Sequence, residues 1–215
     1  MASKPPKPDW FQLVFSVSQY VVKIETPGGH GSGFLCFYGG AGGEICGIAT
    51  AHHVIQHAND WQEPLRLIHG PTAAAAFFNP SERAFLVNPA NDSAIIIIPK
   101  GKLKLPEELL PLLEADRFVY PGVELGWIGF PAVAPQSLCF FSGSVSAKLG
   151  EGYLIDGVAI NGVSGGPVFF IDTRNNSLTI MGAITQYLPN VATGNMLPGL
   201  SFAQSVAHFH SIIEV

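Results

Sequence analysis

The sequence has little charge, and the charge it has is spread along the chain. Charged residues make up 13% of the 215 residues, with 11 Lys and Arg against 16 Asp and Glu, for a formal net charge of −5. No basic run or stripe is present, so nucleic acid is not expected as a partner. A hydrophobic fraction of 47% indicates that much of the chain is buried, in one large domain or two small lobes.

The sequence also lacks a long apolar run. No stretch approaches the length that crosses a bilayer, so membrane insertion is not expected. The first residues, MASKPPKPDW, contain two lysines but no apolar segment behind them, which argues against a secretory signal. We therefore expect a cytoplasmic protein, or one whose leader has been removed.

Cysteine is scarce. The three cysteines have no metal-ligand spacing, so no metal site is expected. Cys36 and Cys46 flank the turn GGAGG at equal distance and could face each other across a hairpin. Two packed thiols are the favoured interpretation in a reducing cytosol, and the sequence leaves the disulfide open.

Glycine (24) and proline (17) are abundant, which favours short strands and turns over long helices. A short helix is predicted in DWFQLVFSVSQ, with Asp9 as N-cap, and another at the end, where apolar residues recur at helical spacing. Many strand-like segments lie between, for example YVVKIET, SAIIIIP and LTIMGAITQYL. The predicted class is all-β: two six-stranded antiparallel β-barrels with short N-terminal and C-terminal helices.

The expected organisation is a disordered leader over residues 1–8 and one domain over residues 9–215. The N-terminal barrel is expected at about 20–100 and the C-terminal barrel at about 124–204, with the terminal helix at 205–215. A connector over 100–123 contains prolines, charges and a helix-like piece from Glu107 to Leu113.

Ser164, in the stretch INGVSGGPVFF, is either a nucleophile or part of a tight turn. A serine hydroxyl needs a base, a group that orients the base, and donors for an oxyanion. Gly162 lets the backbone curl so that its N–H and that of Ser164 point at one spot, an oxyanion hole. Gly165 and Gly166 are expected to leave room for substrate and imidazole.

The candidate base lies in GIATAHHVIQH, where two histidines follow an apolar strand. This segment resembles the trypsin-like peptidases of the chymotrypsin fold, in which a strand ends in Thr-Ala-x-His before an apolar residue. The resemblance implies that His53 is the catalytic base. His52 is the alternative candidate for the base. In the non-catalytic interpretation, the histidine only forms part of a turn.

The candidate orienter is Asp92, which opens the strand in NPANDSAIIIIP. In the same family an Asp-x-Ala begins a buried strand, and its carboxylate receives the Nδ1 proton of the histidine. A plain Asx-turn is the structural alternative, and Asp92 as the orienter is the favoured interpretation. Asp60 and Asp116 are rival acids, but neither leads into a buried strand.

The segment from Gly162 to Pro167 matches the family's Gly-x-Ser-Gly-Gly-Pro. It also satisfies Gly-x-Ser-x-Gly, the nucleophile elbow of α/β-hydrolases. That fold needs the order Ser, acid, His on a strand–turn–helix, and here GPVFFID is strand-like. The order His53, Asp92, Ser164 is that of the chymotrypsin-like group.

Over nearly the whole chain the resemblance is closest to the HtrA/DegP-like branch, through YVVKIET…GSGFL, GWIGFP, SGSVSA and GAITQ. The sequence differs from known members of the family in two respects. The branch's PDZ domain is not expected after residue 215, so its regulation is not carried over. Val163 stands where digestive-type members place an aspartate, so activation by that salt bridge is not expected. If something else orders the oxyanion hole, the Gly162–Val163 peptide is the expected bond to be misoriented at rest.

Substrate-binding residues follow from the same resemblance. Val158 falls where Lys/Arg-cutting enzymes carry an acid, so an apolar P1 residue is expected because a basic one would lack a counter-charge. Tyr187 falls where a glycine often keeps the pocket open, which predicts small or medium P1 side chains unless Tyr187 turns outward. Substrate backbone would pair with Thr185, Gln186 and Tyr187.

The resemblance therefore implies a serine endopeptidase that acts on polypeptides through His53, Asp92 and Ser164, with Gly162 and Ser164 as oxyanion donors. This chemistry needs neither a metal nor a cofactor. The alternative is a latent or non-catalytic module that binds a peptide or regulatory partner and is active only when gated. An esterase using the same triad is a weaker third option.

Overall fold

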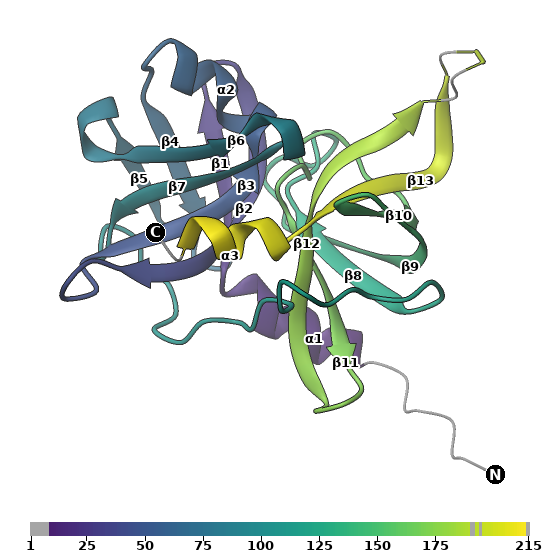
Figure 1. The fold of residues 1–215 in the computed structure, drawn as a ribbon. Helices are drawn as coiled ribbons and strands as arrows, with labels where there is room; N and C mark the ends of the chain where they lie inside the picture. Colours follow the sequence, from purple (N-terminus) through teal and green to yellow (C-terminus); the bar gives the residue numbers. More distant parts are fainter. Residues whose placement is uncertain (1–8, 190–191, 194, 214–215) are drawn as a thin grey trace.

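The computed structural model describes residues 9–189, 192–193 and 195–213, and the expected leader over residues 1–8 lies outside them. Two β-lobes stand side by side, with β4 and β7 in one and β8 and β13 in the other (Figure 1). Among the described residues, no helix is long and apolar enough to cross a membrane.

The N-terminal lobe is one curled antiparallel sheet in the order β5-β4-β1-β2-β3-β7-β6. Its strands are β1 (Val21–Thr26), β2 (Gly29–Gly39), β3 (Ile45–Ala51), β4 (Leu65–His69), β5 (Ala75–Phe78), β6 (Ala84–Asn88) and β7 (Ser93–Pro99). Its edge strands β5 and β6 are not paired with each other, so this lobe is a half-barrel of seven strands where a closed six-stranded barrel is predicted.

The C-terminal lobe is a closed barrel in the order β10-β13-β12-β11-β8-β9. Its strands are β8 (Glu124–Gly129), β9 (Cys139–Leu149), β10 (Gly152–Asp156), β11 (Pro167–Asp172), β12 (Ser177–Pro189) and β13 (Met196–Ser205). The two lobes together confirm the predicted chymotrypsin-like, all-β class.

Both predicted terminal helices are present. Asp9 caps α1 (Trp10–Ser18), where its carboxylate accepts the Gln12 N–H at 3.4 Å. The ring of Trp10 lies 5.3 Å from that of Phe140, which fixes α1 against the C-terminal barrel. Helix α3 (Ala207–Ile213) crosses to the other lobe, where Phe209 meets Phe34 of β2 edge-on.

Four segments differ from prediction in their helical structure. Helix α2 (His52–Asp60) and the 3-10 turns η1 (Pro80–Glu82) and η2 (Pro89–Asn91) were not expected. The predicted helical piece from Glu107 to Leu113 is wrong, because no helix forms there. Pro111 interrupts it, and the carbonyl of Pro111 and the N–H of Leu113 instead bond Ile180 of β12, at 2.9 and 2.7 Å.

The hydrophobic core has two parts. One lies inside the N-terminal sheet, and the other fills the C-terminal barrel and reaches Phe34, Ala49 and Ile95 of the first lobe. Strand β7 pairs with both β3 and β6 and is buried on both faces, which explains its run of isoleucines. This shared core fixes the lobes relative to each other.

All three cysteines are free thiols. Cys46 pairs with Tyr38, whereas Cys36 lies at a register shift between Leu35 and Phe37, so the two do not oppose each other across the hairpin. Burial raises the pKa of the Cys36 thiol well above its usual value and that of Cys46 to about 11. Packed thiols, the favoured interpretation, are what the structure contains.

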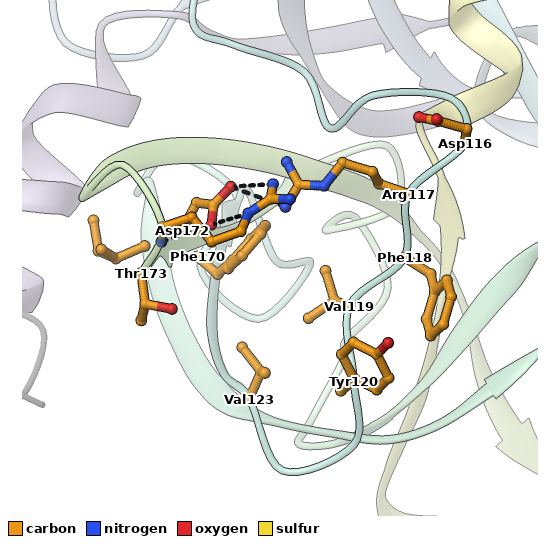
Figure 2. A pocket seen from close by; sticks show the side chains of 11 residues that line it. Asp116, Arg117, Phe118, Val119, Tyr120, Val123, Phe170, Asp172 and Thr173 are labelled. Atoms are coloured by element: carbon orange, nitrogen blue, oxygen red, sulfur yellow. Dashed lines mark hydrogen bonds and ion pairs between the residues drawn. The ribbon is translucent and has the colours of Figure 1, made fainter. Parts of the chain in front are cut away.

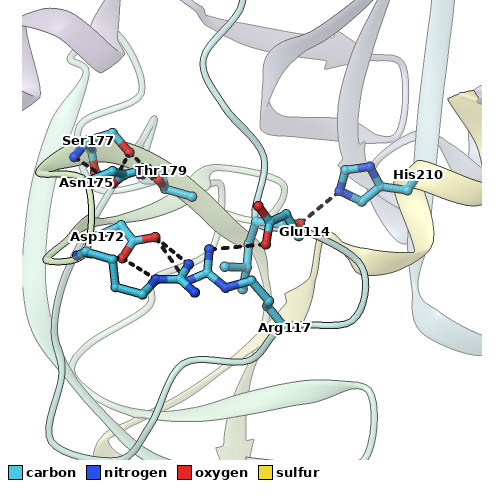
Figure 3. Close-up of polar contacts among 9 residues, drawn as sticks. Glu114, Arg117, Asp172, Asn175, Ser177, Thr179 and His210 are labelled. Atoms are coloured by element: carbon cyan, nitrogen blue, oxygen red, sulfur yellow. Dashed lines mark hydrogen bonds and ion pairs between the residues drawn. The ribbon is translucent and has the colours of Figure 1, made fainter.

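The connector is fastened to the end of β11 by the buried carboxylate of Asp172. Arg174 donates to it through its backbone N–H, Nε and Nη2 at 3.1, 3.1 and 2.8 Å, and Arg117 through Nη2 at 3.0 Å. Figure 3 shows Arg117 between Asp172 and Glu114, and His210 of α3 reaching the same connector through the Leu113 carbonyl at 2.8 Å.

A cavity of about 340 Å³ lies beside this cluster, with Phe118 and Tyr120 at one side and Asp172 at the other (Figure 2). None of the predicted site residues lines it. Both arginines that line it are paired with Asp172, so the cluster acts as a clamp between connector and barrel.

We expect Asp172→Ala to lower the free energy of unfolding by about 2–4 kcal/mol, because it removes the shared acceptor of two guanidinium groups at a buried position. The matched control is Arg174→Ala. Its side chain is 59% exposed, and Asp172 keeps Arg117 and the backbone N–H, so the expected loss is under about 1 kcal/mol. Urea unfolding measures both, and equal losses would contradict the clamp.

Candidate functional site

The pairing of β3 with β7 brings His53 to Asp92. Ala51 lies opposite Ser93 at the end of the ladder, so the residues just beyond the two strands meet. The His53 Nδ1 lies 2.8 Å from Asp92 Oδ2, and the His53 backbone N–H donates to Asp92 Oδ1 at 2.9 Å. Because a carboxylate only accepts, Nδ1 carries the proton and Nε2 faces away from Asp92.

Asp92 also completes helix α2. The residue before that helix, Ala51, has no side chain that can cap it, and the Asp92 carboxylate accepts the exposed His53 N–H instead. Asp92 itself has a left-handed backbone, with φ of 45°, a conformation that aspartate and asparagine tolerate better than most residues. One carboxylate thus fixes both the start of the helix and the orientation of the imidazole.

The rival residues are placed elsewhere. The His52 backbone N–H bonds the Asp92 carbonyl at 3.1 Å, but its ring makes no contact with the Asp92 carboxylate. Asp60 lies at the far end of α2, and Asp116 lines the cavity next to Asp172.

Ser164 follows a tight turn. The Val163 N–H donates to the Ile160 carbonyl at 3.0 Å, and Gly162 occupies the third position of this turn with φ of 90°. A positive φ at that position defines a type II turn and requires glycine or asparagine. The Gly162 residue of the predicted motif is therefore needed for its backbone conformation.

Two N–H groups of this turn remain without a partner. Gly162 N–H and Ser164 N–H donate no hydrogen bond to any residue that the structure describes. The adjacent carbonyls are all bonded: Asn161 accepts from Ala132 at 2.6 Å and Val163 from Gly166 at 2.8 Å. The Gly162 N–H belongs to the Asn161–Gly162 peptide, and the Gly162–Val163 peptide, which is expected to be the one misoriented at rest, is the next along the chain. That expectation stays a prediction.

The role expected for Gly165 and Gly166 also needs correction. A Cβ at Gly165, where φ is 83°, would lie 2.1 Å from the Ser32 carbonyl oxygen. A Cβ at Gly166 would lie 2.3 Å from the Ile128 carbonyl oxygen. These glycines let backbones approach one another, and the nearest atoms belong to the protein rather than to a space for substrate.

His53 and Ser164 line one cavity of about 240 Å³, which lies between the lobes. Its lining comprises Thr26, Gly28, Gly29, His30, His53, Val54, His57, Asn161, Gly162 and Ser164. Within the described chain, the Ser164 hydroxyl makes no hydrogen bond, either to His53 or to another residue. Catalytic hydrogen bonds are often long without substrate, so the shared cavity is the relevant observation.

Two further imidazoles in this cavity were not predicted. His57 Nδ1 lies 2.7 Å from Glu63 Oε2, and His30 Nε2 lies 3.2 Å from the Phe130 carbonyl. Both partners only accept, so each ring donates there and its other nitrogen is an acceptor when neutral. His57 follows His53 by one helical turn, a spacing that could have indicated it. In the described part of the chain, no group of three His, Cys, Asp or Glu could hold a metal ion.

The predicted substrate-binding residues lie outside this cavity. Val158 is 49% exposed, between Gly157 and Ala159, whose backbone groups bond the Ser201 hydroxyl at 2.7 and 2.8 Å. Strand β12 pairs with β11 only as far as Ala183, so Gln186 and Tyr187 pair with β13 alone among the described strands, and Thr185 lies at a register shift between the pairs of Ile184 and Gln186. Gln186 is exposed and Tyr187 partly so, whereas Thr185 is buried.

No model of a protein family matches the sequence, and no curated protein sequence is significantly similar to it. Solved structures match 98% of the chain. The serine endoprotease from Yersinia pestis has a TM-score of 0.69 at 21% identity, with 67% of that chain covered. The inactive form of Rv3671c from M. tuberculosis H37Rv, a serine-to-alanine mutant, has 0.65 at 15% identity, with 94% covered. Deg5 has 0.65 at 18% identity, with 95% covered.

These likenesses establish the fold, since all three identities are below 25%. The chain has the trypsin-like double-barrel fold of serine endoproteases of the HtrA/Deg type. The predicted trypsin-like fold is therefore confirmed.

The double contact of Asp92 predicts different stabilities for two variants. Asp92→Ala removes the cap of α2 and places alanine at a left-handed position, and we expect a loss of about 2 kcal/mol in the free energy of unfolding. Asp92→Asn keeps an acceptor oxygen and tolerates that conformation, so its loss should be under about 0.5 kcal/mol. Chemical unfolding distinguishes them, and equal stability of the two variants would refute the capping role.

Proposed function

We propose that this protein is a serine endopeptidase with His53, Asp92 and Ser164 as its catalytic residues. The observation that carries the proposal is the cavity lined by His53, Gly162 and Ser164, with Asp92 bonded to His53 behind it. The proposed substrates are polypeptides.

In this mechanism Ser164 Oγ attacks the scissile carbonyl and its proton passes to His53 Nε2. Asp92 keeps the Nδ1 proton of His53 in place and stabilises the imidazolium. The N–H groups of Gly162 and Ser164 donate to the oxyanion. His53 then protonates the leaving amine, and water hydrolyses the acyl-enzyme.

The cavity fits the leaving side of the substrate. None of Val158, Thr185, Gln186 and Tyr187, the residues proposed for the acyl side, contributes to its lining. Residues after the scissile bond would therefore lie between His30, His57 and Gly28, while residues before it would pair with the open edge of β12.

The unbonded N–H groups favour an enzyme that is ready to act over one that waits for a partner. Val163, in place of the zymogen-type aspartate, is fully buried in the core, so no salt bridge is needed to order the turn. The alternative is a latent module that binds a peptide or a regulatory protein and requires activation.

Labelling and turnover measured together separate these functions. We expect a fluorophosphonate probe to label the wild type at Ser164, and the wild type to cleave casein or peptides, which an esterase would leave intact while it hydrolyses p-nitrophenyl esters. Ser164→Ala should lose labelling and at least about 10³-fold in turnover. Equal labelling of both proteins would refute the nucleophile, and labelling without turnover would support the latent module.

The surroundings of Val158 predict the P1 preference. A basic P1 side chain would find no counter-charge at Val158 and would lose hydration, so we expect alanine or valine at P1 to exceed lysine or arginine by at least about tenfold in kcat/KM. Tyr187→Gly should admit larger apolar side chains. A peptide series varied at P1 measures both, with Ser164→Ala as the blank, and a preference for lysine or arginine would contradict the assignment.

A further inference from the structure

Ser32 lies at the junction of the two lobes, on β2, and is fully buried. Its N–H donates to the Ser164 carbonyl at 2.8 Å, and its carbonyl accepts from the Thr50 hydroxyl at 2.7 Å. Its hydroxyl donates to the Gly162 carbonyl at 2.8 Å and accepts the Phe130 N–H at 2.9 Å. One side chain of the N-terminal lobe thus contacts two separate segments of the C-terminal lobe.

The three peptides from Asn161 to Ser164 are each fixed through their carbonyl. A peptide is planar and trans, so a carbonyl held in one direction sends the N–H of the same peptide the opposite way. The Ala132 N–H fixes the first peptide, which carries the Gly162 N–H, and the Gly166 N–H fixes the third, which carries the Ser164 N–H.

The middle peptide, Gly162–Val163, is held on both sides: its N–H donates to the Ile160 carbonyl at 3.0 Å within the turn, and its carbonyl accepts from the Ser32 hydroxyl. It joins the two peptides that carry the proposed oxyanion donors. A rotation of this peptide would change ψ of Gly162 and φ of Val163 and would tilt both neighbours. The Ser32 hydroxyl therefore restrains the angle between the two donors from the other lobe.

No other group can replace this hydroxyl. The space around it is closed, because a Cβ at Gly129 would lie only 2.7 Å from Ser32 Oγ. Loss of a single oxygen leaves a void too small for water. The Gly162 carbonyl and the Phe130 N–H would then both lose a partner in a buried place, and the turn would relax to regain one.

We propose that Ser32 is a positioning residue that holds the Gly162–Val163 peptide so that the N–H groups of Gly162 and Ser164 converge on one point. The proposal rests on the proposed function, because convergence matters for an oxyanion. Ser32 itself touches no reacting atom and acts through the turn.

The test compares Ser32→Ala with Tyr153→Phe, assayed on the peptide that is turned over fastest in the P1 series. Tyr153 is equally buried, and its hydroxyl also accepts a backbone N–H, that of Val119 at 3.4 Å, but it lies inside the barrel away from the turn. Both variants lose a buried hydroxyl of this kind, so they control for a purely structural effect.

We expect Ser32→Ala to lower kcat by roughly 10- to 100-fold with KM changed less than about threefold, because a misaligned donor weakens only transition-state binding. Tyr153→Phe should change kcat by less than about twofold. Ser32→Cys, which restores a weak donor of similar size, should recover part of the loss. A fall in kcat no larger than that of the control, or a change confined to KM, would overturn the proposal.

A crystal structure of Ser32→Ala decides the question independently of activity. An unreactive wild type would refute the proposed peptidase but would leave this readout intact. A Gly162–Val163 peptide that has rotated, with changed values of ψ at Gly162 and φ at Val163, supports the positioning role. A turn superimposable on that of the wild type overturns it.

Discussion

The arrangement of the site depends on one backbone hydrogen bond, from the N–H of Ser32 in one lobe to the carbonyl of Ser164 in the other, at 2.8 Å. His53 and Asp92 belong to the N-terminal half-barrel, whereas Gly162 and Ser164 belong to the closed C-terminal barrel. Neither lobe contains a usable site alone. Their relative position must therefore be fixed, and this contact fixes it at the proposed nucleophile, Ser164.

Glycines make this close contact possible. Gly165 lies so near the Ser32 carbonyl and the Thr50 hydroxyl that any side chain would separate the lobes. The shared core, with Phe34 of β2 against Phe209 of α3, supports the same junction from behind. The Asp172 clamp fastens the connector at the far end of β11, the strand that starts just after the Ser164 turn. Strand β11 is thus held at its start by the backbone bond between Ser32 and Ser164 and at its end by the ion pairs of Asp172.

The sequence predicted the parts of the fold that follow from local patterns. Strand periodicity and glycine turns indicated two β-lobes, and the apolar spacing and Asp9 indicated the terminal helices. The order His53, Asp92, Ser164 selected the fold over an α/β-hydrolase. Local patterns failed where distant segments decide, as at Glu107–Leu113, which forms no helix and whose end, from Pro111 to Leu113, bonds Ile180 of β12. The N-terminal lobe also differs from the predicted closed barrel, because its edge strands β5 and β6 do not pair, and strand pairing cannot be read from local patterns.

The same limit applies to the site. Its motifs were visible because each is contiguous, but the positions of Ser32, His30 and His57 at the site depend on how the chain folds. The stretch GSGFL indicated Ser32 only as part of a turn, whereas the structure places it in β2. The two contacts of Asp92, with the imidazole and with the start of α2, could not be separated without knowing that β3 and β7 end together.

We propose that the two lobes form a complete oxyanion site without a partner. A crystal structure of the isolated chain with a peptidyl boronic acid would show whether they do. We expect a tetrahedral boron on Ser164 Oγ, with one boronate oxygen within hydrogen-bond distance of both the Gly162 and Ser164 N–H groups, and the Asn161 carbonyl still bonded to the Ala132 N–H. An adduct whose oxygens meet neither N–H, or a boronic acid that leaves Ser164 unmodified, would contradict it.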